Sequence, residues 1–245
     1  MNENSYRVRL TRRTFFIEEL RGCVLLVGME DFLATINEEP GVKARFLTRV
    51  VGVEVDTDRL GTVARLEPFH RKAVEEMGFG WDRCWRAEQI HGAEIKRVNK
   101  GEAAFIVDGV DGLITNDRGV ILGIYVADCG AVYLVDQKTG AIGLLHSGKK
   151  GTELGILKKA LNMMEVEFGT KPEDVKVVLA PCIRPPAYEV DFASEIRLQA
   201  KELGVKEENF NDCGICTSED IESYYSYRME KGATGRMLAL LGKYE

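Results

Sequence analysis

The sequence predicts an α+β protein in which helices pack on mixed sheets. Short runs of β-branched and aliphatic residues interleave with a few amphipathic helices, without the strict strand–helix–strand rhythm of a doubly wound parallel sheet. The 245 residues are 45% hydrophobic and 29% charged, which is ordinary for a globular chain and excludes a disordered or fibrous one. Because no linker-like tract or internal repeat divides the chain, we expect one domain over residues 1–245.

The first forty-five residues alternate short apolar runs, such as Val24–Val27, with polar segments, and this pattern predicts small strands joined by turns. A helix is expected over Thr62–Gly78, where apolar side chains recur on one side and Gly78 supplies the stop. Within it, Pro68 is expected to end or kink the first turn, since proline lacks the backbone N–H.

The centre of the chain is rich in strands. Five short runs of β-branched, aromatic or aliphatic residues are bounded by Gly, Asp and Asn. The expected strands are Phe105–Asp108, Gly112–Thr115, Val120–Val126, Ala131–Val135 and Ala141–Leu145.

Two helices are expected in the second half. Apolar residues recur at three- and four-residue steps from Leu154 to Phe168, and Gly169 closes that helix. Asp191 is a plausible N-cap for a helix over Phe192–Leu203, which Gly204 ends.

The remaining elements are short and apolar. We expect a buried strand over Val175–Leu179, an aromatic strand over Ser223–Tyr227 and a last apolar turn over Met237–Leu241.

Charge and composition limit the partners. The net charge is −6 and no basic run occurs at either end, so we expect no nucleic-acid partner. Met1–Arg13 lacks the apolar core of a signal peptide, and Asp128 breaks the longest apolar stretch, Gly119–Val135, so no membrane partner is expected. The six cysteines are interpreted as free thiols in a reducing cytoplasm, and nothing in the sequence indicates an oligomeric state.

Histidine is scarce, with only His70, His91 and His146. This count excludes the imidazole-rich copper clusters of a true multicopper oxidase within one chain, although a single copper doing weak oxidation remains open.

Two of these histidines and one cysteine stand at predicted strand edges. His91 is at an expected strand start, Cys129 is in a turn between two strands, and His146 closes an apolar run. Each alone is also typical of ordinary packing or hydrogen bonding. They are 38 and 17 positions apart, which is compatible with convergence of neighbouring strands. Two imidazoles and one thiolate suit Zn²⁺ or copper, and three ligands with an open fourth position are typical of catalytic zinc.

Basic residues offer candidate anion sites. Lys149 and Lys150 lie in a Gly-rich turn before a helix, which favours either an anion site or a solvated turn, and the spacing is not that of a Walker loop. Arg228 and Arg236 stand among aromatic residues and glycines, where they could bind phosphate or carboxylate, or simply stack. The Cys213–Cys216 pair is interpreted as incidental thiols.

Several ordered segments, together spanning about residues 45–241, resemble the bacterial laccase-domain family of multicopper polyphenol oxidoreductases, some members of which are purine nucleoside phosphorylases. The resembling segments are Gln89–Gly92, Val126–Cys129, His146–Gly151, Tyr188–Val190, Cys216–Thr217, Ser226–Arg228 and Thr234–Met237, with a weaker match at Leu47–Arg49.

The resemblance implies a four-layer α/β/β/α fold with mixed sheets. It also implies a zinc or copper site on His91, Cys129 and His146, which would be the catalytic residues, and Arg49 as a phosphate or substrate anchor. The implied activities are phosphorolysis of adenosine, inosine and methylthioadenosine, and deamination of adenosine. The expected partners are therefore a small-molecule nucleoside and phosphate, with Lys149 and Arg228 as further binding residues.

The chain departs from the family pattern at the turn before the helix. The family has Trp and Arg where this chain has Lys149 and Lys150, and Leu-Pro where it has Gly130 and Ala131. Lysine keeps the positive charge but loses a planar, bidentate group. We therefore expect a divergent member of the family with its own choice of substrate.

Two other functions are compatible with the same residues. Cys129 could be the nucleophile of a cysteine-dependent amide hydrolase that acts on peptidoglycan precursors, with His146 or His91 as its base. The departures from the family pattern would also suit a degenerate binding protein.

Overall fold

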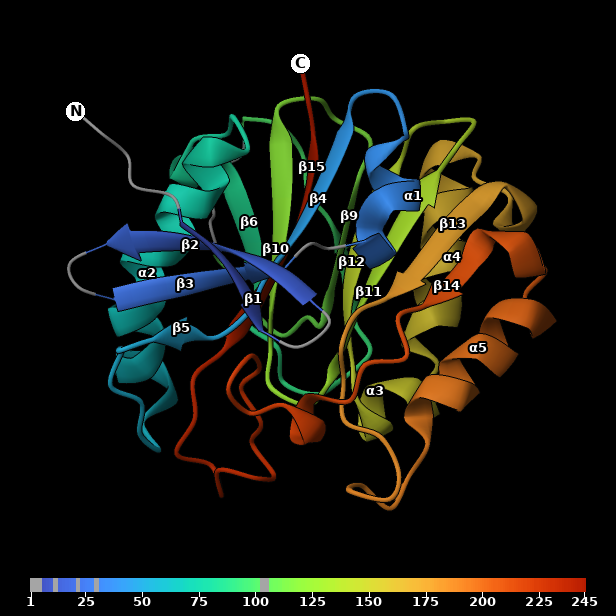
Figure 1. Ribbon diagram of the computed structural model, residues 1–245. Helices are drawn as coiled ribbons and strands as arrows, with labels where there is room; N and C mark the ends of the chain where they lie inside the picture. Colours follow the sequence, from blue (N-terminus) through green and yellow to red (C-terminus); the bar gives the residue numbers. More distant parts are fainter. Residues whose placement is uncertain (1–5, 11–12, 21–22, 29–30, 102–105) are drawn as a thin grey trace.

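Two sheets packed face to face form the centre of the molecule, and helices cover their outer faces (Figure 1). The computed structural model describes residues 6–10, 13–20, 23–28, 31–101 and 106–245. The order of layers is helix α2, a five-stranded sheet, a six-stranded sheet, and helices α4 and α5. The α/β/β/α layering with mixed sheets is therefore confirmed.

The five-stranded sheet has the order β4-β15-β10-β6-β8, with antiparallel pairs except for β10–β6 and β6–β8. Its strands are β4 (Val42–Leu47), β15 (Met237–Lys243), β10 (Val120–Val126), β6 (Cys84–Ala87) and β8 (Ile106–Val107). Every residue of β10 and β15 is buried, because both faces of this sheet are covered near its centre.

The six-stranded sheet has the order β14-β13-β11-β12-β9-β7, in which only the outer pairs β13–β14 and β7–β9 are parallel. Its strands are β14 (Phe210–Asp212), β13 (Val175–Leu179), β11 (Gly130–Asp136), β12 (Ile142–Ser147), β9 (Gly112–Thr115) and β7 (Ile95–Arg97).

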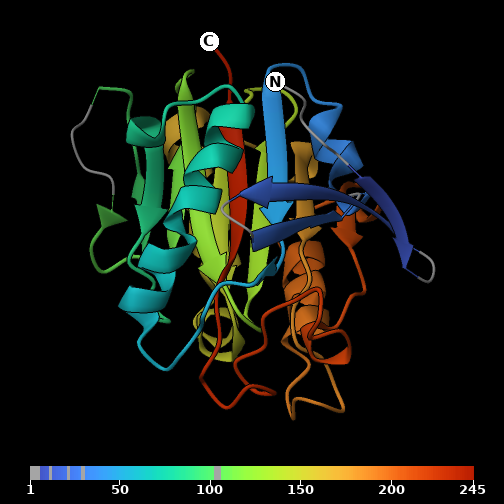
Figure 2. The ribbon, with the colours of Figure 1, turned by 60° about the vertical axis from the view of Figure 1, so that its left-hand side comes forward.

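A four-stranded antiparallel sheet, β1-β2-β3-β5, completes the described strands. Its strands are β1 (Tyr6–Leu10), β2 (Arg13–Leu20), β3 (Cys23–Gly28) and β5 (Val50–Val51). Figure 2 shows its blue strands and the teal helix α2 lying across the outer face of the five-stranded sheet. Residues 1–5, part of the polar N-terminal segment considered above, lie outside the described residues.

The five α-helices of the described residues are α1 (Ala34–Asn37), α2 (Arg59–Glu76), α3 (Lys149–Glu153), α4 (Ile156–Phe168) and α5 (Phe192–Glu202). Asp191 caps α5 as expected, since its carboxylate accepts a hydrogen bond from the Ser194 N–H at 3.0 Å. Gly155, with φ of 71°, separates α3 from α4, so α4 begins two residues later than predicted.

The alternation of side chains along β11 divides the core into two parts. Tyr133 and Val135 belong to the cluster between the two sheets, whereas Val132 and Leu134 belong to the cluster under α4 and α5. The Tyr133 hydroxyl donates a hydrogen bond to the Arg45 carbonyl at 2.9 Å, which ties this sheet to β4.

Most of the expected strands and helices are present, with a few corrections. The central strands agree to within a residue or two, although Phe105 of the first lies outside the described residues. Pro68 lies inside α2 and does not end it. The buried stripe of α2, which includes Leu66 and Phe69, packs on the sheet and outweighs the lost hydrogen bond.

The predictions for the two C-terminal segments are both wrong: the expected strand forms turns, and the expected turn forms a strand. Ser223–Tyr227 forms turns, because the buried Tyr225 is held through its hydroxyl, which donates to the Val50 carbonyl at 3.1 Å, and not through a strand ladder. Met237–Leu241 is part of the central strand β15. A continuous apolar run carries no periodicity that separates a buried strand from a turn or helix.

Across the described residues, no helix combines the length and apolar character needed to span a bilayer.

Candidate metal and substrate site

Three chain segments meet at the lower end of the two sheets in the view of Figure 1. Cys129 lies in the short crossing from β10 to β11, His146 is on β12, and His91 is in the loop that follows β6. One ligand atom from each of these side chains lies within 4.8 Å of the others, and no other group of this kind is found among the described residues. The rings of His91 and His146 are 4.9 Å apart and nearly perpendicular.

Asp111 links the two histidines of this group through hydrogen bonds. Its buried carboxylate accepts hydrogen bonds from His146 Nδ1 at 2.8 Å, from the His91 N–H at 3.0 Å and from the Gly92 N–H at 2.6 Å. Because Nδ1–H of His146 donates to a carboxylate, its Nε2 is left as the free ligand atom. Asp111 is not among the residues predicted from sequence, because its only signal is a lone carboxylate directly before an apolar strand.

The electrostatics favour a thiolate at Cys129. Burial alone raises the pKa of this thiol, but hydrogen bonds and positive charge from His146 and His91 outweigh it and lower the pKa to about 6. Burial likewise lowers the pKa of His146, but Asp111 and Cys129 reverse that effect and raise it to about 9. Metals bind the thiolate form of cysteine, so Cys129 is suited to ligation, whereas a metal would have to displace the Nε2 proton that the raised pKa of His146 retains at neutral pH.

Hydrogen bonds hold the site loops in unusual backbone conformations. Gln89, His91 and Asp128 have φ values of 64°, 60° and 81°. The Gln89 side chain donates to the Tyr125 carbonyl at 2.5 Å and accepts from the Tyr125 N–H at 2.8 Å. His91 is therefore in a fixed loop and not at a strand start as predicted.

Asp128 joins three loops around Cys129. Its carboxylate accepts hydrogen bonds from the Thr217 hydroxyl and the Arg228 N–H, both at 2.7 Å, and its carbonyl accepts from the Ile183 N–H at 2.8 Å. The position of the cysteine thus depends on a carboxylate that does not itself belong to the ligand group.

Gly148 is required by close packing. A Cβ atom at this position would lie 2.5 Å from Cys129 Sγ, well inside contact distance. The glycine therefore lets the turn before α3 approach the thiol.

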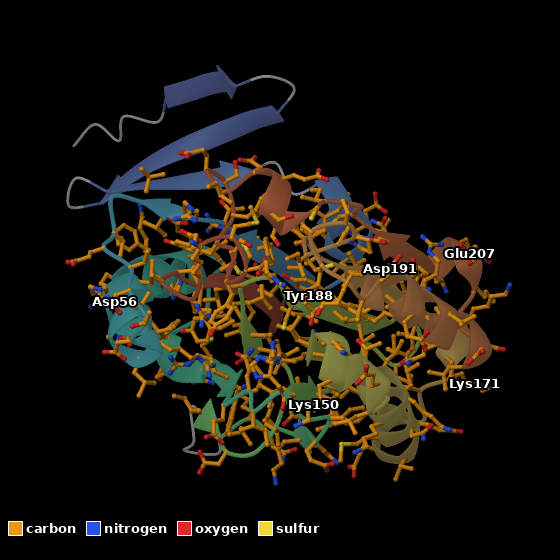
Figure 3. The ribbon with its side chains drawn as sticks, turned by 90° about the horizontal axis from the view of Figure 1, so that it is seen from below. Asp56, Lys150, Lys171, Tyr188, Asp191 and Glu207 are labelled. Atoms are coloured by element: carbon orange, nitrogen blue, oxygen red, sulfur yellow. The ribbon has the colours of Figure 1, made fainter. Side chains whose placement is uncertain are left out.

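A cavity of about 900 Å³ opens over the three side chains. Part of its wall is apolar and aromatic, formed by Ile183, Tyr188, Phe192 and Tyr227. The rest is markedly cationic, and the positively charged side chains that line it are Arg59, Lys149, Lys150, Arg228, Lys231 and Arg236. In Figure 3, which views this end of the molecule, Tyr188 lies near the centre, between Lys150 and Asp191.

The other predicted binding residues divide into two groups. Lys149 and Arg228 line the cavity, and Arg228 also pairs with Glu189 at 2.7 Å. Arg49 does not line it. Its guanidinium pairs with Glu230 at 2.7 Å and stacks on Tyr225 at 4.2 Å, so it anchors the loop before β15. Arg59 and Lys231 also line the cavity, but no spacing in the sequence predicts them.

The chain matches a known family over most of its length. Residues 52–195 and 190–243 match the family model described as multi-copper polyphenol oxidoreductase laccase. All three candidate ligands lie within the matched residues. The chain belongs to this laccase family.

Two relatives of this laccase-family chain have names that state an activity. It is 30% identical over 240 residues to a protein of Geobacillus stearothermophilus named purine nucleoside phosphorylase YlmD, covering 83% of this chain and 86% of the relative. It is 31% identical over 180 residues to a purine nucleoside phosphorylase of Staphylococcus epidermidis, covering 62% and 66%.

Solved structures agree with the fold of this family member. The crystal structure of YlmD from Geobacillus stearothermophilus superposes with a TM-score of 0.76 at 27% identity, covering 93% of this chain and 98% of that one. The hypothetical protein YfiH of Bacillus licheniformis has a TM-score of 0.76 at 21% identity, covering 89% and 96%, which supports the fold alone.

Proposed function

We propose that this laccase-family member is a metal-dependent purine nucleoside phosphorylase. The observation that carries the proposal is the position of the His91–Cys129–His146 group in a cavity lined by both aromatic and cationic side chains. Aromatic side chains suit a purine base, and cationic side chains suit phosphate. The names of the relatives from Geobacillus and Staphylococcus point to the same reaction.

The donor set fits a single divalent ion. His91, Cys129 and His146 would hold it, with a thiolate favoured at Cys129 and Asp111 fixing the free nitrogen of His146. We propose Zn²⁺, and copper is compatible with the same donors. Such an ion would supply a Lewis acid at the floor of the cavity.

The remaining lining residues would bind and orient the substrates. Tyr188 and Tyr227 offer flat surfaces on which a purine can stack, and the cations would hold phosphate beside the sugar. An oxygen of phosphate then forms a bond to C1′ of the ribose while the C1′–N9 bond breaks. The electron pair stays on the purine, which takes up a proton from water, and the products are the free base and ribose 1-phosphate.

The test measures base release from adenosine, inosine and methylthioadenosine by the zinc-loaded protein, with and without phosphate. We expect phosphate-dependent release that Cys129→Ser abolishes and Cys213→Ser leaves intact, because Cys213 lies outside the cavity lining. Formation of inosine from adenosine without phosphate would establish the deaminase activity instead. No turnover of any nucleoside by metal-loaded protein would overturn the proposal and favour a degenerate binding protein.

One observation also favours a second candidate, a cysteine-dependent amide hydrolase acting on peptidoglycan precursors. Asp111, His146 and Cys129 are arranged as carboxylate, base and thiol, which is the order of a catalytic triad. In that case an alkylating agent would trap Cys129 covalently, and a chelator would leave the activity unchanged. The proposed phosphorylase should instead lose activity to a chelator and regain it with zinc.

A further inference from the structure

The positive charge of the side chains that line the cavity exceeds what is needed to bind one phosphate ion. The whole chain carries a net charge of −6, yet six cationic side chains line this one cavity. Asp128 is the only carboxylate of the lining, and the Thr217 hydroxyl and the Arg228 amide already occupy it. Only Arg228 has a carboxylate partner, Glu189. The other five, among the described residues, have no ion pair; these are Arg59, Lys149, Lys150, Lys231 and Arg236.

Two of these cations form a pair of like charges. Arg59 and Arg236 both line the cavity and are partly buried. Backbone carbonyls hold both: Arg59 donates to the Glu88 carbonyl at 3.1 Å, and Arg236 donates to the carbonyls of Thr234 and Gly235 at 3.2 and 2.7 Å. Each guanidinium has five N–H donors, so several remain for a ligand. Burial, with the charge of Arg59 next in size, lowers the pKa of Arg236, so the two positive charges are close enough to repel each other.

Lys149 and Lys150 approach the cavity from the other sheet. Lys149 and Lys150 begin α3, directly after β12 of the six-stranded sheet, whereas Arg59 begins α2 and Arg236 precedes β15 of the five-stranded sheet. In Figure 3, Lys150 lies apart from Asp56, which is close in sequence to the start of α2. Lys149 and Lys150 therefore enter the cavity beside the six-stranded sheet, and Arg59 and Arg236 enter it beside the five-stranded sheet.

We propose that the substrate carries a phosphate of its own and is a purine nucleoside monophosphate, with the Arg59–Arg236 pair holding that phosphate. Lys149 and Lys150 then hold inorganic phosphate. Each phosphate carries about −1.5 to −2 at neutral pH, so two of them balance most of the five unpaired cations, whereas one leaves about three uncompensated. The cavity of about 900 Å³ is at the upper end of the range for small-molecule sites and leaves room for both groups.

This inference rests on the proposed function, and the chemical step is the same. The C1′–N9 bond breaks, the C1′–O bond to phosphate forms, and the purine leaves with the electron pair and takes up a proton. From a nucleoside 5′-monophosphate the products are the base and ribose 1,5-bisphosphate. No oxidant or further reactant is needed.

The kinetic test compares kcat/KM for IMP with that for inosine, and for AMP with that for adenosine, in the zinc-loaded protein. We expect the nucleotide to be preferred by tenfold or more, and Arg59→Gln to reduce this preference about tenfold through the KM for the nucleotide. Arg71→Gln is the matched control, because Arg71 is an exposed arginine of the same helix that pairs with Glu67 outside the cavity. Phosphate-dependent turnover of inosine without any preference for IMP would overturn the inference and leave the proposed function standing.

Calorimetry provides a readout that does not depend on turnover. AMP should bind at least tenfold more tightly than adenosine to the wild type, and Arg59→Gln should remove this difference. Saturating inorganic phosphate should leave AMP binding in place, because the two anions occupy different groups of cations. The inference would be overturned if AMP and adenosine bind equally well, or if phosphate displaces AMP. Tighter binding of a uridine diphosphate sugar than of AMP would also overturn it.

Discussion

The Asp111 carboxylate accepts a hydrogen bond from His146 Nδ1 at 2.8 Å, and its backbone carbonyl accepts from the His146 N–H at 2.7 Å. One residue therefore fixes both the ring and the main chain of a candidate ligand. Because the same carboxylate also accepts from the His91 and Gly92 amides, the loop that carries the second imidazole depends on it as well.

Replacing this carboxylate should weaken metal binding. We expect Asp111→Asn to lower zinc affinity by about 10- to 100-fold, since an amide no longer fixes the His146 ring with a charged acceptor. Competition with a chelator of known affinity measures the change. Asp136→Asn is the matched control, because Asp136 is an equally buried carboxylate that bonds to Thr139 away from the site. Equal losses in both variants would indicate general destabilisation and contradict the role of Asp111.

Because Gly148 lies so close to Cys129, we expect the effects of substitutions at these two positions on stability to depend on each other. Gly148→Ala places a Cβ 2.5 Å from Cys129 Sγ, so we expect weakened zinc binding and a loss of about 1–3 kcal/mol in the free energy of unfolding. In a Cys129→Ala background the same change should cost much less, because the sulfur is gone. Urea denaturation of the four metal-free proteins measures this double-mutant cycle. Additive effects would show that the strain arises elsewhere.

His70 makes the fold sensitive to acid. It lies buried on α2 against Tyr125, and burial, followed by the positive charge of Arg86, lowers its pKa from 6.5 to about 3. Between these two pH values the unfolded chain binds a proton that the folded protein rejects. Stability therefore falls as pH drops from about 6.5 toward 3, by up to about 1.4 kcal/mol per pH unit.

The measurement compares the unfolding free energy of metal-free wild type with that of His70→Phe at several pH values from 7 to 4. The carboxylates and the two site histidines contribute equally to both proteins and cancel in the difference. We expect the variant to gain stability relative to the wild type steadily as pH falls. A difference that stays constant with pH would show that His70 does not control the acid response.

We expect Arg49 to stabilise the fold and not to bind substrate. Its ion pair with Glu230 is only 16% and 18% exposed at the two side chains, and it stacks on Tyr225. We expect Arg49→Gln to cost about 1–3 kcal/mol in the free energy of unfolding, and Glu230→Gln to cost a similar amount. If Arg49→Gln instead leaves stability unchanged and raises the KM for phosphate, Arg49 is the phosphate anchor that the family resemblance implies.

Elements that a local sequence pattern determines can be predicted most reliably from the sequence. The strands around Cys129 were found because their β-branched and aliphatic runs end at Gly or Asp, and α5 was found because Asp191 caps an amphipathic stretch. The turns at Ser223–Tyr227 were missed because a tyrosine that is buried through its hydroxyl looks like a strand residue in sequence.

The site could be predicted only in part for a similar reason. His91, Cys129 and His146 were found through short motifs, whereas Asp111 and Arg59 carry no motif and act through neighbours that only the fold brings near. A lone carboxylate before a strand and a lone arginine at a helix start are common in all proteins. Their roles depend on tertiary contacts that no spacing in the sequence encodes.

The crossing at Cys129 also has a consequence for how the protein is made. β10 belongs to one sheet and β11 to the other, so Cys129 lies in the segment that connects them, close to His91 and His146. β10 pairs with β15, which comes much later in the chain. A nascent chain that has just exposed His146 therefore already contains all three candidate ligands but lacks the strand that completes the first sheet. We expect such a chain to capture no metal tightly, so that loading waits for nearly complete synthesis.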